Sequence, residues 1–90
     1  MELVENLKKY RMFRQITQQQ LANILGKSKS VISNWERGEN FPNPHECEQI
    51  CRVLDITPNQ LFGWEENKDF KKFMKQIEQI QKMMEEGEKA

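Results

Sequence analysis

Four polar side chains near the middle of the chain are of the types that read DNA bases. A lysine, Lys29, donates to guanine O6 and N7, an asparagine, Asn34, pairs in bidentate fashion with adenine, and serines serve either role. Together with Ser30 and Ser33, these residues fall on the outward side of a predicted helix whose apolar positions face the protein. Any short surface helix also needs a polar face, so composition alone does not separate a DNA contact from simple solvation.

Further polar side chains nearby are candidates for phosphate contacts, which fix register without reading sequence. Gln18 begins the preceding helix, where free N–H groups and the helix dipole favour a phosphate oxygen. Lys27 lies in the turn between the two helices, Arg37 ends the second helix, and Asn40 follows it. The alternative for Gln18 is an ordinary solvated glutamine.

Two short amphipathic patterns must position these side chains. The first runs from Thr17, whose side chain caps the helix together with Gln20, and ends at Gly26, where a left-handed residue is expected. The second runs over residues 28–37, with Ser28 as its expected N-cap. Two helices joined by a tight glycine-containing turn form a helix-turn-helix, whose second helix enters the DNA major groove.

This segment and its surroundings resemble the lambda-repressor-like (Xre) family of helix-turn-helix DNA-binding regulators. The resemblance covers roughly residues 3–64 and is specific, because several fixed spacings hold together. It implies an all-α fold: a five-helix DNA-binding domain over residues 1–64, with its motif at 17–37 and its recognition helix at 28–37. The matching residues are Thr17-Gln18, Leu21-Ala22, Leu25-Gly26, Ile32-Ser33, Trp35-Glu36-Arg37-Gly38, Pro42, Leu54 and Gln60-Leu61-Phe62.

The resemblance also implies roles for single residues. Positions matching Lys29, Ser30 and Asn34 commonly meet base edges in the family, whereas Ser33 more often supports them or touches the backbone, and Gln18 contacts phosphate. Arg11 and Glu36 resemble a partly buried ion pair that joins the first and third helices. Glu39 stands where the family often has a cation, which weakens the expected phosphate clamp there.

Length and composition indicate one small water-soluble domain with an appendage. The chain has 90 residues, 37% hydrophobic and 31% charged, with a mean hydropathy of −0.88. It contains neither a membrane-spanning run nor a signal-peptide pattern, so we expect it in the cytoplasm and away from membranes. Its net charge of zero argues mildly against nucleic-acid binding, so the cations must gather on one face.

Catalysis and metal binding are not expected. Cys47 and Cys51 are four residues apart in a helical pattern, and His45 is the single histidine, which is too few ligands for a metal site. We interpret both cysteines as small buried apolar side chains. With no phosphate-cradling glycine loop and no grouped carboxylates, the sequence predicts neither an enzyme nor a cofactor.

The remaining helices follow from apolar spacing and capping residues. We expect a first helix over residues 2–14, further helices beginning at Asn43-Pro44 and Thr57-Pro58, and Gly63 as the end of the fifth. Residues 65–90 make up a separate C-terminal region. We expect it to contain an amphipathic helix that is capped by Asn67 and stopped by Gly87.

The last helix carries an apolar stripe that requires a partner. It either folds back on its own domain or pairs with the same helix in a second chain, and heptad spacing favours pairing. Lysines in its first half and glutamates in its second half favour an antiparallel arrangement. The expected dimer interface comprises Phe70, Phe73, Met74, Ile77, Ile80 and Met84.

These features predict a sequence-specific double-stranded-DNA-binding transcriptional regulator. Because one recognition helix reads only half a site, we expect a repressor that binds a palindromic operator as a homodimer. One alternative is the antitoxin of a toxin–antitoxin pair, with the last helix binding the toxin or another protein partner. Another is a protein-interaction module that retains the fold without binding DNA.

Overall fold

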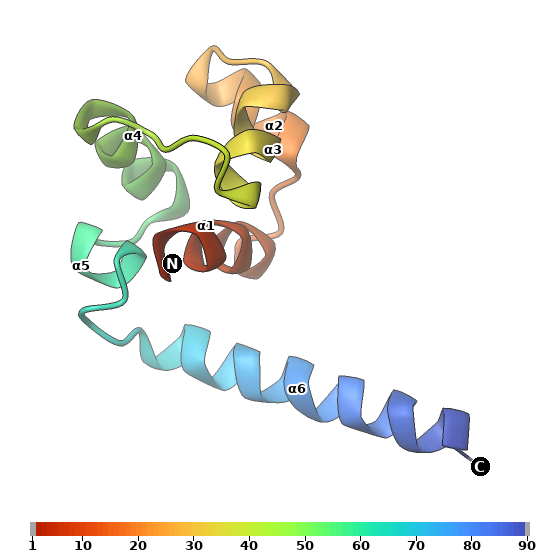
Figure 1. Cartoon of the computed structure of the whole chain (residues 1–90). Helices are drawn as coiled ribbons and strands as arrows, with labels where there is room; N and C mark the ends of the chain where they lie inside the picture. Colours follow the sequence, from red (N-terminus) through yellow and green to blue (C-terminus); the bar gives the residue numbers. More distant parts are fainter. Residues whose placement is uncertain (1, 90) are drawn as a thin grey trace.

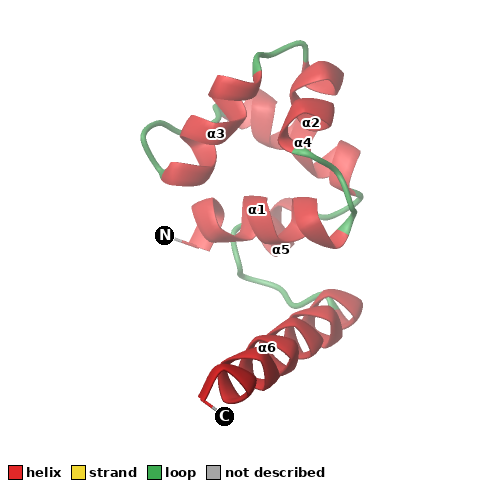
Figure 2. Ribbon diagram, turned by 90° about the vertical axis from the view of Figure 1, so that its right-hand side faces the viewer, coloured by secondary structure: helices red, strands yellow, loops and turns green. Residues whose placement is uncertain are grey.

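The computed structural model describes residues 2–89, and side chains through residue 87. Its described part is all-α, as the sequence predicts, and it contains no helix with the length and apolar character needed to cross a membrane. Five helices gather into a body, and the last one leaves it as a straight arm (Figures 1 and 2). The helices are α1 (Glu2–Phe13), α2 (Gln18–Leu25), α3 (Lys29–Arg37), α4 (Pro44–Leu54), α5 (Pro58–Leu61) and α6 (Lys68–Lys89).

The body is built on one apolar core to which each of the first five helices contributes. Leu7, Leu21, Ile32, Leu54 and Leu61 are at most 1% exposed, so burial of their side chains drives the association of the helices. The same core includes the Trp35 side chain of α3, which is 3% exposed. The buried cluster further includes Leu3, Tyr10, Ala22, Trp35, Ile50, Cys51 and Ile56.

Local capping defines where the motif helices begin and end. The Thr17 hydroxyl accepts from the Gln20 backbone N–H at 3.0 Å, and the Gln20 side chain accepts from the Thr17 N–H at 2.8 Å. Gly26 follows in the left-handed region at φ 68°, which a residue without Cβ adopts without strain. Ser28 takes the N-cap position of α3, but the expected capping hydrogen bond from its side chain is not formed.

Three predicted helix ends need correction. The first helix stops at Phe13, one residue early, because Gln15 turns the chain at φ 59°. The fifth helix ends at Leu61, so Gly63, at φ 81°, comes after its cap rather than at its end. Gly87 does not stop α6, which continues to Lys89; a helical glycine costs only about 1 kcal/mol and does not by itself end a helix.

The first turns of α6 pack against α1. The Phe70 ring stacks on Tyr10 with centroids 3.8 Å apart, and Phe73 lies 5.3 Å from the Phe13 ring. The expectation that the stripe faces a second chain along its whole length is therefore wrong for Phe70, whose ring joins the core of its own domain. Folding back was the other arrangement that the sequence allowed, and it applies to this end of the helix.

Replacing the Phe70 ring should weaken the packing of α6 on α1 without unfolding the body. We expect Phe70→Ala to lower the free energy of unfolding by about 1–2 kcal/mol, less than the about 3–5 kcal/mol of a fully buried phenylalanine, because its ring is half-buried. Urea denaturation followed by circular dichroism measures this loss. Gln76→Ala, at an exposed position of the same helix outside its apolar stripe, is the control, and equal losses for both variants would contradict the anchoring.

Candidate nucleic-acid interface

Helix α3 presents the four predicted base-reading residues on its outer side. Lys29 and Ser30 are exposed at its N-terminal end, and Ser33 and Asn34 are half-buried one turn further on. On the opposite side, Ile32 and Trp35 are in the core, and α2 packs directly against α3. The helix is therefore held by one face and offers the other, which is the arrangement needed to enter a groove.

Arg37 organises the C-terminal part of this outer face. Its guanidinium donates to the Ser33 hydroxyl, to Asn34 Oδ1 at 2.5 Å and to Glu39 Oε1 at 3.1 Å. The hydrogen bond with Glu39 raises the pKa of Arg37 and lowers the pKa of Glu39. A phosphate at the expected Arg37 contact would therefore have to compete with these hydrogen bonds within the protein.

The hydrogen bond from Arg37 to Asn34 also determines which end of the Asn34 amide is free to face a ligand. A guanidinium only donates hydrogen bonds, so the atom of Asn34 that faces Arg37 must be the amide oxygen. The amide nitrogen, with two donors, is left for other partners. In this conformation the amide oxygen already accepts from Arg37, whereas bidentate pairing with adenine needs the oxygen as well as the nitrogen.

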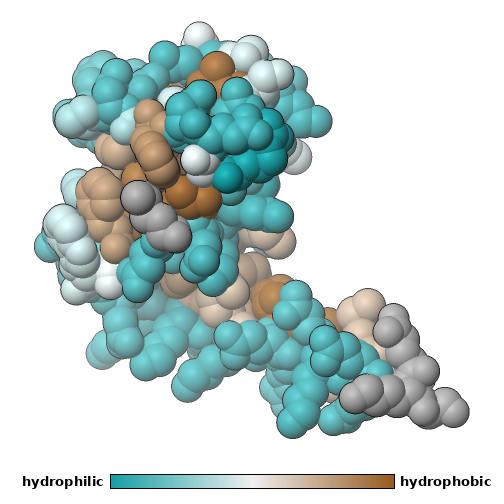
Figure 3. Space-filling view, viewed as in Figure 1, coloured by the Kyte–Doolittle hydropathy of each residue, from teal (hydrophilic) through white to brown (hydrophobic). Residues whose placement is uncertain are grey.

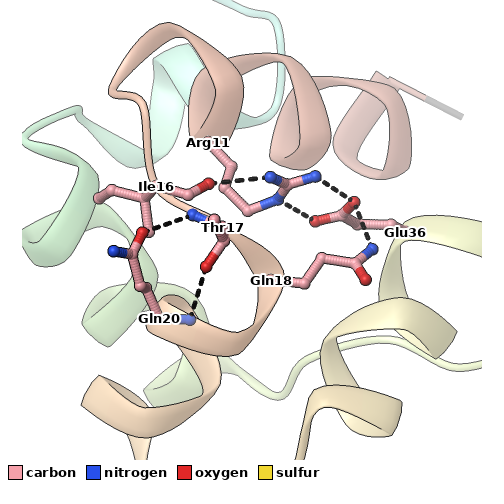
Figure 4. A network of polar contacts seen from close by, with 6 residues as sticks. All are labelled: Arg11, Ile16, Thr17, Gln18, Gln20 and Glu36. Atoms are coloured by element: carbon pink, nitrogen blue, oxygen red, sulfur yellow. Dashed lines mark hydrogen bonds and ion pairs between the residues drawn. The ribbon is translucent and has the colours of Figure 1, made fainter.

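Glu36 is the centre of the polar network behind the interface (Figure 4). Arg11 Nε donates to its Oε2 at 2.7 Å and Arg11 Nη2 to its Oε1 at 3.0 Å, forming a bidentate ion pair between α1 and α3. Gln18 Nε2, from α2, donates to the same Oε1 at 3.0 Å. One carboxylate therefore connects three helices.

The pair is shielded from solvent and fully hydrogen-bonded. The Glu36 side chain is 4% exposed and that of Arg11 11%, and the remaining Arg11 contact is a donation to the Ile16 carbonyl at 2.8 Å. Burying charges is tolerable only when their donors and acceptors are satisfied in this way. Gln18 is half-buried with one amide hydrogen taken by Glu36, so only its other hydrogen remains for a phosphate.

Lys27, in the turn of the motif, is also engaged. Its ammonium lies 2.7 Å from Glu46 Oε2 at the start of α4. The hydrogen bond from Lys27, followed by the one from the Asn43 N–H, lowers the pKa of Glu46. Sequence reasoning placed Lys27 correctly in the turn but missed this bridge, because no periodicity links the turn to a residue 19 positions later.

Asn40 and the two cysteines complete the set of predicted residues. Asn40 is exposed in the loop after α3, on the C-terminal side of the Arg37 cluster. Cys47 and Cys51 are buried, and burial raises the pKa of Cys51 to about 11, which disfavours the reactive thiolate. Among residues 2–89, no group of three or more His, Cys, Asp or Glu side chains is placed to hold a metal ion.

Removing the central carboxylate should destabilise the domain strongly. We expect Glu36→Ala to cost about 3–5 kcal/mol, because it leaves the Arg11 guanidinium buried without its counter-charge. For a chain of this size the melting temperature should fall by more than about 10 °C. Glu39→Ala is the matched control, since its ion pair with Arg37 is more than half exposed and screened by solvent, so its loss should change stability little. Equal, small effects in thermal melts would contradict the role of Glu36.

The ion pair between Lys27 and Glu46 should make the free energy of unfolding depend on pH. Glu46→Gln keeps an oxygen for the cap at Asn43 but loses the charge that faces Lys27, so unfolding at pH 7 should become easier by about 0.5–1 kcal/mol. Because folding lowers the pKa of Glu46, this stabilisation is complete above about pH 4.3 and is lost as the pH falls through the folded pKa. Urea titrations at several pH values test this; a difference between the two proteins that persists unchanged at pH 2 would refute it.

Comparison with known proteins agrees with this geometry. A family model described as helix-turn-helix matches residues 7–61. The chain is 36% identical over 66 residues to the HTH-type transcriptional activator BcrR of Enterococcus faecalis, spanning 73% of this chain but only 32% of the activator. It is 29% identical over all 90 residues to the cryptic phage CTXphi transcriptional repressor RstR of Vibrio cholerae, of which it covers 80%.

Two solved structures share the body. The P22 c2 repressor, in a complex with a synthetic operator, matches with a TM-score of 0.65 and 28% identity, over 72% of this chain and 98% of that one. The solution structure of the DNA-binding domain of the same repressor matches with a TM-score of 0.64 and 30% identity, over 68% of this chain and 80% of that one.

Proposed function

Because the chain belongs to the lambda-repressor-like (Xre) helix-turn-helix family of DNA-binding transcriptional regulators, we propose that it is a sequence-specific repressor that reads double-stranded DNA with α3. The observation that carries this proposal is the outer face of α3, with base-reading side chains held in place by the Glu36 network behind it. The similar repressor whose structure contains an operator supports a duplex as the ligand. Repression follows from occupying the site where transcription begins.

Lys29 and Ser30 come first in our proposed base readout, because they lie at the exposed N-terminal end of the helix. Lys29 donates to guanine, and Ser30 donates or accepts. Asn34, with its oxygen turned to Arg37, donates to an acceptor such as guanine O6 or thymine O4. Ser33, whose hydroxyl accepts from Arg37, supports this arrangement rather than reading a base by itself.

Phosphate contacts in this proposal come from Gln18, Lys27, Arg37 and Asn40. Lys27 and Arg37 are bound to carboxylates in the free protein, but solvent screens ion pairs at these partly exposed positions, so a phosphate can replace the carboxylate. These cations lie around α3, which reconciles DNA binding with a net charge of zero. Gln18 uses its second amide hydrogen while it still braces Glu36.

A complete operator requires two copies of the chain. One α3 spans about half a site, and two helices related by a two-fold axis read half-sites about 34 Å apart. We therefore propose a homodimer on a palindromic operator. This arrangement makes the two half-sites identical and the affinity of the dimer much higher than that of one body alone.

Random-site selection from a duplex library, followed by sequencing, tests this function. Selection should yield an inverted repeat. Affinity for the selected site should fall steeply with salt: the logarithm of the binding constant, plotted against the logarithm of the salt concentration, should have a slope of about −0.9 per phosphate contacted. Asn34→Ala should relax the base preference at one position per half-site, by less than the about 1–3 kcal/mol of a bidentate contact, because the amide nitrogen alone makes the contact. Gln18→Ala should weaken binding to all sequences alike, because phosphate contacts carry no sequence information.

Gln19→Ala is the control for Gln18→Ala, since its side chain is exposed and bonded to Asn23 on the same helix. It should bind as the wild type does. Failure of the folded protein to select any duplex would reject the proposed function and favour a protein-interaction module instead.

A further inference from the structure

We propose that the distal half of α6 is an interaction surface for a second copy of the same helix, and that the two helices run antiparallel. The surface consists of Met74, Ile77, Ile80, Met83 and Met84, which we call the distal stripe. It excludes the proximal aromatic rings, because Phe70 and Phe73 already contact α1.

Exposure of the distal stripe is the first observation behind this proposal. Ile80, Met83 and Met84 are 53%, 63% and 64% exposed, although they lie three and four residues apart on one side of a helix. Figure 3 shows apolar surface along the part of α6 that extends beyond the body. A cluster of large apolar side chains at helical spacing is the pattern of a face that packs against another helix.

Helix length is the second observation. Among the 22 residues of α6, Phe70 and Phe73 pack on α1, whereas Ile80, Met83 and Met84 are more than half exposed, so the far end lacks apolar packing to hold it helical. An isolated helical segment of this length is marginal in water, since most helix stability in proteins comes from packing of the apolar face. A second copy supplies that packing to both helices at once.

The distribution of charged residues along α6 indicates whether the two helices run parallel or antiparallel. Over residues 68–76 there are four lysines against one aspartate, whereas residues 77–87 carry three glutamates against one lysine. A parallel pair would set lysines beside lysines and glutamates beside glutamates, and an antiparallel pair sets each basic half beside an acidic half. The charged residues are Lys68, Asp69, Lys71, Lys72 and Lys75 in the first half, and Glu78, Lys82, Glu85 and Glu86 in the second.

The apolar spacing also defines a register. If Ile77 lies opposite Ile80 of the partner subunit, the two-fold axis passes between residues 78 and 79. Lys72 then lies level with Glu85 of the partner subunit.

Analytical ultracentrifugation of the full chain, without DNA, tests whether this surface pairs. The wild type should be a dimer, and Ile80→Glu should raise its dissociation constant by at least about 100-fold, because each dimer then buries two unpaired carboxylates. Gln79→Glu introduces the same charge at an exposed neighbouring position and is the control. Circular dichroism verifies that both variants keep the folded body.

Charge reversal tests the direction. The double variant Lys71→Glu with Lys72→Glu should weaken an antiparallel dimer by at least about tenfold, because it makes both halves acidic. Adding Glu85→Lys and Glu86→Lys to the same chain should restore it. A dimer that is indifferent to the double variant would overturn the antiparallel arrangement.

A monomeric wild-type chain, or a dimer unaffected by Ile80→Glu, would overturn the surface itself. Both results are obtained without DNA, so they test the dimer that this inference and the proposed function share, whereas DNA reading by α3 is tested separately by random-site selection. A monomer that still selects single half-sites would leave the role of α3 intact.

Discussion

The Glu36 carboxylate is the contact on which the interface depends. It belongs to α3 but takes its hydrogen bonds from Arg11 on α1 and Gln18 on α2, so it fixes the recognition helix against both neighbours. Ile32 and Trp35 turn one face of α3 to the core, and the bidentate ion pair adds a directional contact on the same inner side. The face that α3 turns outward is therefore set by apolar packing and by one acidic residue together.

The outer face follows from the same constraint. With Glu36 directed inward, Ser33, Asn34 and Arg37 lie together on the other side, and Arg37 orients the Asn34 amide. The two arginines thus have different functions. Arg11 is buried and joins α1 to α3, whereas Arg37 is exposed and bonded to Glu39.

Local features were predictable from the sequence, and long-range ones were not. The cap at Thr17 and the left-handed turn at Gly26 depend only on neighbouring residues, and the core follows from apolar periodicity. The bridge from Lys27 to Glu46 joins surface residues of different helices, which no local pattern encodes. The stacking of Phe70 on Tyr10 was likewise hidden, because a heptad pattern fits pairing within or between chains equally well. The Arg37 cluster had a readable signal in its three- and four-residue spacing from Asn34 and Ser33.

The central claim, that α3 reads DNA while Glu36 holds it in place, is tested most directly by backbone amide NMR. The chain would be titrated with the duplex obtained from selection. The account predicts chemical-shift changes concentrated at the N-terminus of α2 and over residues 27–40, with amides near Glu36 keeping their slow hydrogen exchange. Shift changes confined to α6, or none at any duplex concentration, would contradict it.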